Sequence, residues 1–321
     1  MSITVRKTFE TEPKMMRETY CGTLMELASA DDRIVALDAD LMSSSGMKPF
    51  KTAYPDRFVN CGVAEANMVG VAAGLSAMGK VPFAHSFGTF ASRRVCDQIF
   101  MSAAYARLNV RIVGSDPGVC AAYNGGTHMP LEDMAVLRAI PEMILVEPTD
   151  SVMLANLLPQ IANNYGVYYI RLLRKNAVAV YEPGSTFTIG KGETLRDGAD
   201  VTLMASGIMV AEALKAAQLL ADDGVSARVI NLFTWKPLDA ELVTRCARET
   251  GAVVTCENHN VMGGLGSAIA ETLVKTCPVP VEMIGVQDEF GEVGPEDYLR
   301  GRFNLNAVDI AAAAKKAIAR K

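Results

Sequence analysis

The sequence has 321 residues, of which 50% are hydrophobic and 21% are charged, and its formal net charge is −5. A chain of this length and apolar content can bury a sizeable core, and at roughly 150 residues per domain we expect two domains. Because Lys and Arg are not in surplus, neither nucleic acid nor an anionic membrane is expected as a partner.

The cysteines and the N-terminal segment favour the cytoplasm. The seven cysteines form no CxxC pair and are odd in number, which is typical of reduced cytosolic thiols. The segment MSITVRKTFETEPKMM (1–16) carries charges throughout and lacks the apolar core of a signal peptide. No later segment approaches the roughly 18 uncharged apolar residues of a membrane span. We therefore predict a soluble, cytoplasmic protein.

Apolar runs alternate with alanine-rich helical stretches in the first part of the chain. The helix EANMVGVAAGLSAMG (65–79) is preceded by the strand-like run RIVALDAD (33–40) and followed by VRIVGSD (110–116) and MILVEPTD (143–150). This order predicts βαβ units and a parallel sheet. The runs end in polar residues, which places those residues at the carboxyl ends of strands, where open parallel sheets bind ligands.

A polar stretch rich in Gly, Pro, Thr and Asp, YEPGSTFTIGKGETLRDGAD (181–200), interrupts this pattern. A second series then runs from VTLMASG (201–207) through SARVINLFTWKPL (226–238) and GAVVTCENH (251–259), continues in PVEMIGVQD (280–288), and ends in the helix 307–321. We predict an α/β protein of two doubly wound domains, with a parallel and a mostly parallel sheet. The expected boundaries are 1–182, a linker 183–200, and 201–321.

The first candidate functional residue is Glu65, in CGVAEANMVGVAAG (61–74). A carboxylate in this apolar setting needs a partner or a raised pKa, and both are common at functional sites. The alternative is a glutamate that only stabilises the start of a helix through the macrodipole.

The pattern GVAExxMVGxAxGL followed by VPFxHSFxTFxxRR resembles the pyrimidine-binding domain of the transketolase family. The resemblance covers nearly the whole chain, and implies that a transketolase C-terminal domain follows. It also implies that thiamine diphosphate is the cofactor and that Glu65 is catalytic. In this family the glutamate contacts the N1′ nitrogen of the aminopyrimidine and favours the imino tautomer, which removes the C2 proton.

The segment PFAHSFGTFASRR (82–94) contains two phenylalanines three positions apart. Core packing alone would account for them. The resemblance instead implies that Phe87 and Phe90 line the pocket around the pyrimidine ring. A tyrosine is often present one turn later in the family, and Arg93 occupies its approximate place as a third candidate for cofactor binding.

NGGTHMPLEDMAVLR (124–138) resembles the DGPTHQPxE loop of the family. This implies that His128 is catalytic and hydrogen-bonds the donor ketose. Asn124 replaces an aspartate that contacts a substrate hydroxyl, and Gly126 replaces a proline, so the hydroxyl preference is expected to differ. His85, where many transketolases have Ser or Thr, is a further candidate on the substrate side.

The third histidine, His259, lies in CENHNVMGGLGSAIAE (256–271), which resembles the glycine-rich segment of the family's C-terminal domain. An isolated glycine-rich segment can cradle a phosphate, but a structural turn into a helix is the favoured interpretation.

Three further residues resemble contacts to a sugar phosphate in the family: Arg17 in KMMRETYCG, Ser44 in DADLMSSSG and Arg174 in RLLRKN. Arginine offers a bidentate fork for phosphate oxygens. Solvated surface side chains are the alternative for each of them. A family histidine near Ser115 is missing.

A complete transketolase also has a GDG segment and a downstream Asn that bind the divalent ion, and this chain has no Gly-Asp dipeptide. The resemblance therefore implies a second chain, an N-terminal transketolase subunit that binds the diphosphate and Mg²⁺ with oxygen ligands. No metal ligands are expected here. An α2β2 heterotetramer is the expected assembly, and self-association is expected for the chain alone.

The resemblance implies transfer of a two-carbon ketol unit between sugar phosphates. The alternatives are a beta-type subunit of a 2-oxo-acid dehydrogenase, a deoxyxylulose-phosphate-synthase-like chain, and a regulatory or scaffold subunit without catalysis. The THMP loop with Arg17 and Arg174 favours sugar phosphates over a 2-oxo acid. Retention of Glu65 and His128 argues against a silent subunit.

Overall fold

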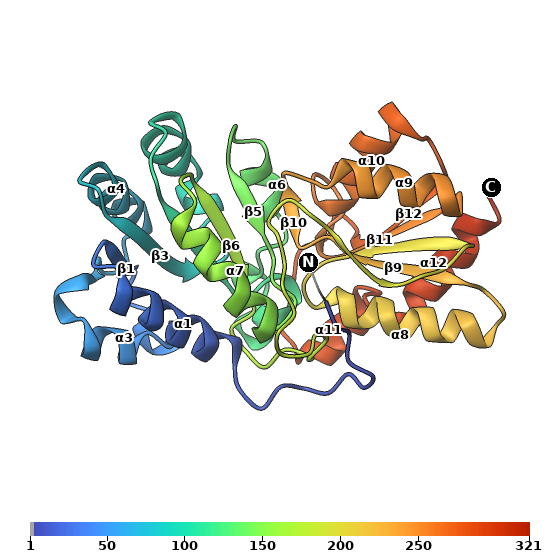
Figure 1. Ribbon diagram of the computed structural model, residues 1–321, viewed down its shortest axis with the longest axis horizontal. Helices are drawn as coiled ribbons and strands as arrows, with labels where there is room; N and C mark the ends of the chain where they lie inside the picture. The colour runs from blue at the N-terminus through green and yellow to red at the C-terminus, as the bar shows by residue number, and fades with distance from the viewer. Residues whose placement is uncertain (1–2) are drawn as a thin grey trace.

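The alternating strand and helix patterns form two α/β domains that lie side by side in the computed structural model, which describes residues 3–321 (Figure 1). The first domain contains a seven-stranded sheet of order β10-β5-β6-β4-β3-β1-β2. Its strands are β1 (Ile34–Asp38), β2 (Phe58–Asn60), β3 (Val81–Phe87), β4 (Arg111–Ser115), β5 (Ile144–Val146), β6 (Tyr168–Leu172) and β10 (Thr234–Lys236). All neighbours are parallel except β10, which runs antiparallel to β5.

The second domain contains a five-stranded sheet of order β12-β11-β8-β9-β7. Its strands are β7 (Glu193–Arg196), β8 (Val201–Ala205), β9 (Ala227–Asn231), β11 (Val253–Asn260) and β12 (Val281–Val286). Only β7 is antiparallel to its neighbour. The central strands β1, β4, β6 and β8 are buried at every position, as expected for parallel strands covered by helices on both faces. The predicted fold class is confirmed.

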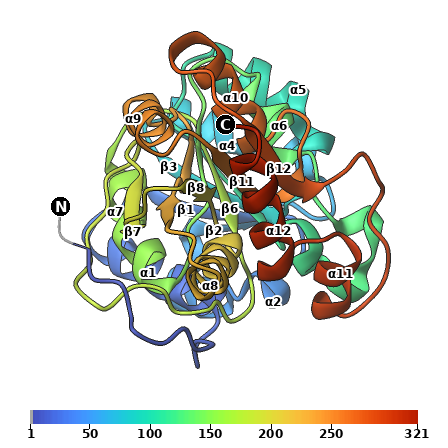
Figure 2. The same ribbon diagram turned by 90° about the vertical axis from the view of Figure 1, so that its right-hand side faces the viewer.

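Two helical layers cover the sheets, and each layer extends over both domains. One core contains side chains of α1 (Met16–Ala30), α7 (Ser151–Asn163), α8 (Met209–Asp222) and α12 (Ala307–Ile318). The other contains side chains of α4 (Glu65–Ala77), the π-helical η3 (Ile99–Tyr105), α6 (Asp133–Arg138), α9 (Ala240–Thr250) and α10 (Leu265–Thr276). In Figure 2, α9 and α10 lie above the second sheet and α8 and α12 below it.

Shorter helices lie mostly in the connections at the carboxyl ends of the strands. They are α2 (Met42–Ser45), α3 (Lys48–Ala53), η1 (Pro55–Arg57), η2 (Arg93–Val95), α5 (Cys96–Gln98), η4 (Gly118–Asn124), η5 (Gly126–His128) and α11 (Glu296–Arg302). No helix within residues 3–321 combines the length and apolar character that a membrane span needs.

The run 226–238, read from the sequence as one apolar segment, contains two strands that join different sheets. β9 lies in the second sheet, whereas β10 crosses back and pairs with β5 of the first. Trp235 on β10 is 1% exposed, so this crossing is part of the packed junction between the domains. The expected linker 183–200 contains β7, at the edge of the second sheet. The domain boundaries themselves stay a prediction.

The strand register places several candidate residues at one edge of the first sheet. Asp38 at the end of β1 is aligned with His85 on β3, and Phe87 at the end of β3 is aligned with Ser115 on β4. The connections that follow these strands carry Ser44, Phe90 and His128. Because carboxyl ends of parallel strands share an edge, these distant segments of sequence meet there.

Candidate active site

Glu65 begins helix α4 and its side chain is buried, with 3% of the residue exposed. Its Oε2 accepts a hydrogen bond from Nη1 of Arg94 at 2.8 Å, and Oγ of Ser86 lies 3.5 Å from its Oε1. The carboxylate has therefore found a charged partner, as its apolar setting required. Ser86 lies on β3, so this partner set joins α4 to the strand edge.

Arg94 also covers an aromatic ring. Its guanidinium carbon lies 3.9 Å from the ring centroid of Phe90, a stacked cation–π geometry. A flat, hydrogen-bond-donating cation thus lies on Phe90 and donates to Glu65 at once. Sequence reasoning missed Arg94 and chose its neighbour Arg93. Arg93 points elsewhere, to Glu132, with 2.5 Å between Nη1 and Oε1.

Phe87, Phe90 and His128 form one cluster from two segments of the chain. The two phenylalanine centroids are 6.2 Å apart, and the His128 ring is 5.2 Å from Phe90 and 6.0 Å from Phe87. All three side chains are only half-buried, so simple core packing does not describe them. Nδ1 of His128 is 3.0 Å from Oγ1 of Thr127. The arrangement presents aromatic faces and an imidazole to the same space.

The three residues expected to contact a sugar phosphate come together. Nη1 of Arg17 donates to the Ser44 carbonyl oxygen at 3.0 Å, and its backbone N–H donates to the Arg174 carbonyl oxygen at 3.4 Å. Arg17 also lines a surface cavity of about 480 Å³ with Ser43 and Lys48. These contacts place the three residues in one region, at the ends of β1 and β6.

Arg174 connects this region to the aromatic cluster. Its guanidinium lies 5.4 Å from the Phe87 ring centroid. It also forms a bidentate pair with Asp116, through Nε to Oδ1 at 3.0 Å and Nη2 to Oδ2 at 2.8 Å. Asp116 is 1% exposed. The Arg174 guanidinium, which could bind an anionic substrate group, is therefore already paired with a buried carboxylate.

His85 lies deeper than the other candidates, with 2% of the residue exposed and its ring edge-on to Tyr20 at 5.4 Å. Neither ring nitrogen has a hydrogen-bond partner among the described residues. Its role toward substrate stays a prediction. Burial, with a smaller contribution from the Arg174 charge, lowers the pKa of His85 to about 3.

This shift predicts a pH-dependent stability. Unfolded imidazole has a pKa of about 6.5, so between about 6.5 and 3 the unfolded chain binds a proton that the folded chain does not. The free energy of unfolding should therefore fall as the pH decreases from 6.5 toward 3. In His85→Phe, which keeps an aromatic ring beside Tyr20, the unfolding midpoint should drop less between about pH 7 and pH 5 than in the wild type. An identical pH slope in thermal unfolding would contradict the neutral, buried histidine.

One of the two departures from the family pattern in the loop that carries His128 has a structural reason. A Cβ atom at Gly126 would lie 2.0 Å from the Gly291 carbonyl oxygen, in the connection after β12. A proline at this position would collide with that backbone. Asn124, by contrast, ends η4 and is exposed.

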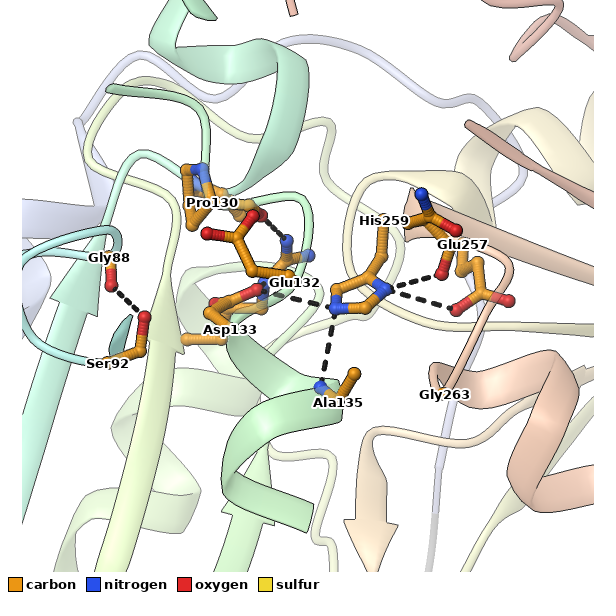
Figure 3. Close-up of polar contacts among 12 residues, drawn as sticks. Gly88, Ser92, Pro130, Glu132, Asp133, Ala135, Glu257, His259 and Gly263 are labelled. Carbon is orange, nitrogen blue, oxygen red and sulfur yellow. Dashed lines mark hydrogen bonds and ion pairs between the residues drawn. The ribbon is translucent and has the colours of Figure 1, made fainter. Parts of the chain in front are cut away.

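His259 is fully buried on β11 and lies between two carboxylates (Figure 3). Its Nε2 is 3.7 Å from Oδ1 of Asp133, and its Nδ1 is 3.8 Å from Oε2 of Glu257. Burial lowers the pKa of His259 to about 4, and burial raises the pKa of Glu257 to about 8. The glycine-rich segment leads into α10, whose first amides at Leu265 and Gly266 already donate to Glu257. These contacts agree with the interpretation of the glycine-rich segment as a structural turn into a helix, rather than as a phosphate-binding segment.

Within residues 3–321, no group of three or more His, Cys, Asp or Glu side chains is placed to hold a metal ion. What the described residues do bring together is a buried carboxylate, aromatic faces, an imidazole and arginines along one sheet edge. Such a set can hold a flat heterocycle and an anionic, hydroxylated substrate.

Family models account for most of the chain. Residues 12–178 match the transketolase pyrimidine-binding domain, and residues 190–310 match the transketolase C-terminal domain.

Several named proteins are similar over most of this chain. The 6-deoxy-6-sulfo-D-fructose transketolase subunit SqwH of Clostridium sp. strain MSTE9 is 56% identical, over 97% of this chain and 96% of that protein. One of the subunits of the apulose-4-phosphate transketolase of Phocaeicola vulgatus is 38% identical, over 85% of this chain and 88% of that protein. The 1-deoxy-D-xylulose-5-phosphate synthase of Heliobacterium modesticaldum is also 38% identical, over 95% of this chain but only 47% of that protein.

Solved structures agree with these matches. A chain described as a split gene transketolase, inactive beta4 tetramer, superimposes with a TM-score of 0.90 and 43% identity, over 96% of this chain and 99% of that chain. The transketolase of Leishmania mexicana shares the fold, with a TM-score of 0.80 at 21% identity, and only 47% of its chain is covered. The chain therefore belongs to the transketolase family, and it is a C-terminal type of subunit of the split transketolases.

Proposed function

We propose that the chain, together with an N-terminal partner subunit, catalyses transfer of a two-carbon ketol unit between sugar phosphates, with thiamine diphosphate as cofactor. One observation carries the proposal: Glu65, Phe90 and His128 share a continuous site at the carboxyl edge of the first sheet, linked through Arg94. In this proposal Glu65 and His128 are the catalytic residues, and Phe87 and Phe90 line the cofactor pocket. Arg93 could contact the cofactor only by leaving Glu132, with which its side chain is paired.

The contacts of Arg94 provide a test of fit for the aminopyrimidine. Its guanidinium is planar, donates to Glu65 and stacks on Phe90, and a protonated aminopyrimidine has the same three properties. When bound, thiamine diphosphate supplies the nucleophilic carbon and the electron sink. Glu65 would then hold a proton at the ring nitrogen in place of its hydrogen bond from Arg94, whose side chain is half-exposed. His128 would hydrogen-bond the donor ketose beside the aromatic rings.

We propose that Mg²⁺ and the diphosphate are held by the partner subunit. The absence of any Gly-Asp dipeptide from the sequence supports this division, because the family binds the ion with oxygen ligands of a GDG segment. Cytoplasmic localisation is part of the proposal, and is supported by the seven cysteines, all of which are free.

The surface supports association with other chains, as an α2β2 complex with the partner and as self-association without it. Helix α4 exposes Gly70 and Gly74 one turn apart, and a Cβ atom at either would meet nothing within 4 Å. Exposed glycine inside a helix costs about 1 kcal/mol relative to alanine, so close approach by another chain is a reason to keep it. Exposed apolar side chains near η3 add to this surface: Phe100, Met101, Tyr105 and Tyr165.

A second candidate donor carries a sulfonate instead of a phosphate. The Clostridium relative named above is described as a 6-deoxy-6-sulfo-D-fructose transketolase subunit. Here the pairing of Arg174 with Asp116 leaves one net positive charge among Arg17, Arg174 and Asp116. With the Arg174 charge already matched by Asp116, a monoanionic sulfonate needs less unpaired positive charge at these residues than a dianionic phosphate does.

The test is a donor comparison in the reconstituted two-chain complex, with xylulose 5-phosphate, 6-deoxy-6-sulfofructose and pyruvate. Ketol transfer from either sugar supports the proposed reaction, and the ratio of kcat/KM values identifies the preferred anion. Turnover of pyruvate without ketol transfer would establish one of the alternative enzymes. Binding of cofactor without any turnover would establish a silent subunit.

Arg174→Ala is expected to raise KM for a donor with an anionic terminus by roughly ten- to a hundredfold, since a charged hydrogen bond contributes about 1.5–3 kcal/mol. An unphosphorylated analogue should change much less. The matched control is Asp116→Asn, which frees the fork and should lower KM for the dianionic phosphate. Equal losses with both donors after Arg174→Ala would make Arg174 a structural partner of Asp116 only.

A further inference from the structure

The loop between β4 and α6, residues 116–132, has a backbone that needs support from elsewhere. Asp116 and Ala122 have positive φ angles of 61° and 50°, and Ala122 combines this with a ψ of −116°. Gly118 and Gly125 also lie at positive φ. Non-glycine residues in such conformations persist only where surrounding contacts hold them. His128 is on this loop, so those contacts decide where its imidazole lies.

The start of the loop is held by Asn258, which is on β11 in the C-terminal domain and is 1% exposed. Its Oδ1 accepts from the Val119 N–H at 3.0 Å, and its Nδ2 donates to the Pro117 carbonyl oxygen at 2.8 Å. The fit is close, because a Cβ atom at Gly118 would lie 2.2 Å from the same Oδ1. The side-chain amide therefore replaces a backbone partner for this turn.

The end of the loop is held by the next two residues of β11. The Asn260 N–H donates to the Leu131 carbonyl oxygen at 2.8 Å. His259 accepts from the Ala135 N–H at 3.4 Å and lies beside Asp133, as Figure 3 shows. Fully buried Arg171 links the end of the loop to Asn258 on β11, because its Nη2 donates to the carbonyl oxygens of Pro130 at 2.8 Å and Asn258 at 3.0 Å.

The connection after β12, also in the C-terminal domain, packs against the middle of the loop. Gly291 packs backbone to backbone against Gly126, two residues from His128. A Cβ atom at Gly291 would lie 2.5 Å from Sδ of Met129 and 3.0 Å from the Gly126 Cα atom. The loop is thus held at its start, its middle and its end by one domain.

We propose that the C-terminal domain is a positioning part of the active site, and that Asn258 fixes the conformation of the loop that presents His128. The inference rests on the proposed function of that loop. Among the described residues, Asn258 has no hydrogen bond to the aromatic cluster or to Glu65, and its side chain contacts the loop through the backbone of Pro117 and Val119 and through Sγ of Cys120, 3.6 Å from its Nδ2. It is a positioning residue rather than a catalytic one.

The experiment compares wild type, Asn258→Ala and Thr202→Val in the two-chain complex. Thr202 is the matched control: it is a buried residue of the same sheet with an Oγ1 contact of 2.8 Å to Thr250, and touches no part of the loop. Asn258→Ala should lower kcat/KM for the donor ten- to a hundredfold, since a displacement of about 1 Å can cost about 10²-fold. Affinity for thiamine diphosphate should change little, and amides 118–128 should exchange hydrogen faster.

Gly291→Ala provides an independent disturbance from the other side and should produce the same selective loss at the donor step. Wild-type donor kinetics and amide exchange in Asn258→Ala would overturn the proposal. The proposal would also be overturned if Asn258→Ala and Thr202→Val lost donor turnover, cofactor affinity and thermal stability to the same extent. Asn258 would then have only a general structural role. Amide exchange does not depend on turnover, so the two claims can fail separately. If the wild-type complex transfers no ketol unit, the proposed function is rejected. Faster amide exchange of the loop in Asn258→Ala would still show that Asn258 fixes the loop conformation.

Discussion

Glu65→Gln is expected to reduce ketol transfer by the two-chain complex to a trace, with little change in folding. The glutamine oxygen can still accept from Arg94 and the side chain keeps its size, so the buried start of α4 should survive. What is lost is the negative charge that holds a proton at the aminopyrimidine nitrogen. A positioned acid–base group typically contributes about 10²–10⁴-fold to the rate.

The matched control is Glu212→Gln. Glu212 on α8 is also a buried glutamate, 6% exposed, with cationic partners in Lys215 and Arg300, but among the described residues it has no hydrogen bond or ion pair with Glu65 or Arg94. Steady-state kinetics should be close to wild type in this variant. A Glu65→Gln complex with near wild-type turnover would remove Glu65 from the mechanism.

The second large effect is the dependence of catalysis on a partner. The purified chain alone should show no ketol transfer from any donor, and addition of a chain with a GDG segment should restore it. Glu65, Phe87 and Phe90 address only the aminopyrimidine end of the cofactor. The reaction also needs the diphosphate and its metal ion to be bound in a fixed position. Without the partner subunit, the reacting carbon of the cofactor would have no defined position.

Titration of one chain with the other makes this prediction quantitative. Initial rates should rise with added partner and level off at a one-to-one ratio, and the partner by itself should be inactive. Activity of the isolated chain that is unchanged by the partner would contradict the split arrangement.

Much of the fold could be predicted because the parallel strands are buried on both faces. The runs at 33–40, 110–116 and 201–207 became β1, β4 and β8, whose apolar residues are dictated by burial alone. β10 could not be predicted in the same way. It is three residues long and pairs with a strand almost ninety positions earlier, so its place depends on how the domains pack.

The candidate site was predicted in part, and for a comparable reason. Glu65 was a candidate because a carboxylate in an apolar segment must find a partner, and motif resemblance added Phe87, Phe90 and His128. Arg94 was missed, since nothing local distinguishes it from Arg93 and its contact with Glu65 crosses 29 positions. The adjacent arginines Arg93 and Arg94 were the only feature of the sequence that could have indicated an arginine at this site.

The role of Asn258 could not be predicted from the sequence because its contacts with Pro117 and Val119 span more than 130 positions. The sequence shows a polar residue near the end of a strand and not that it supports a loop of the other domain. Gly126 illustrates the converse: the departure from the family pattern was evident in the sequence, and the close approach of Gly291 supplies its cause.

The most direct test of the split-enzyme account is a calorimetric titration of thiamine diphosphate with Mg²⁺ into the isolated chain and into the two-chain complex. The account predicts weak binding to the chain alone, because most of the affinity should come from the diphosphate and its metal, whose ligands lie on the partner. It predicts tight, metal-dependent binding to the complex. Tight, metal-dependent binding to the isolated chain, accompanied by ketol transfer, would contradict it.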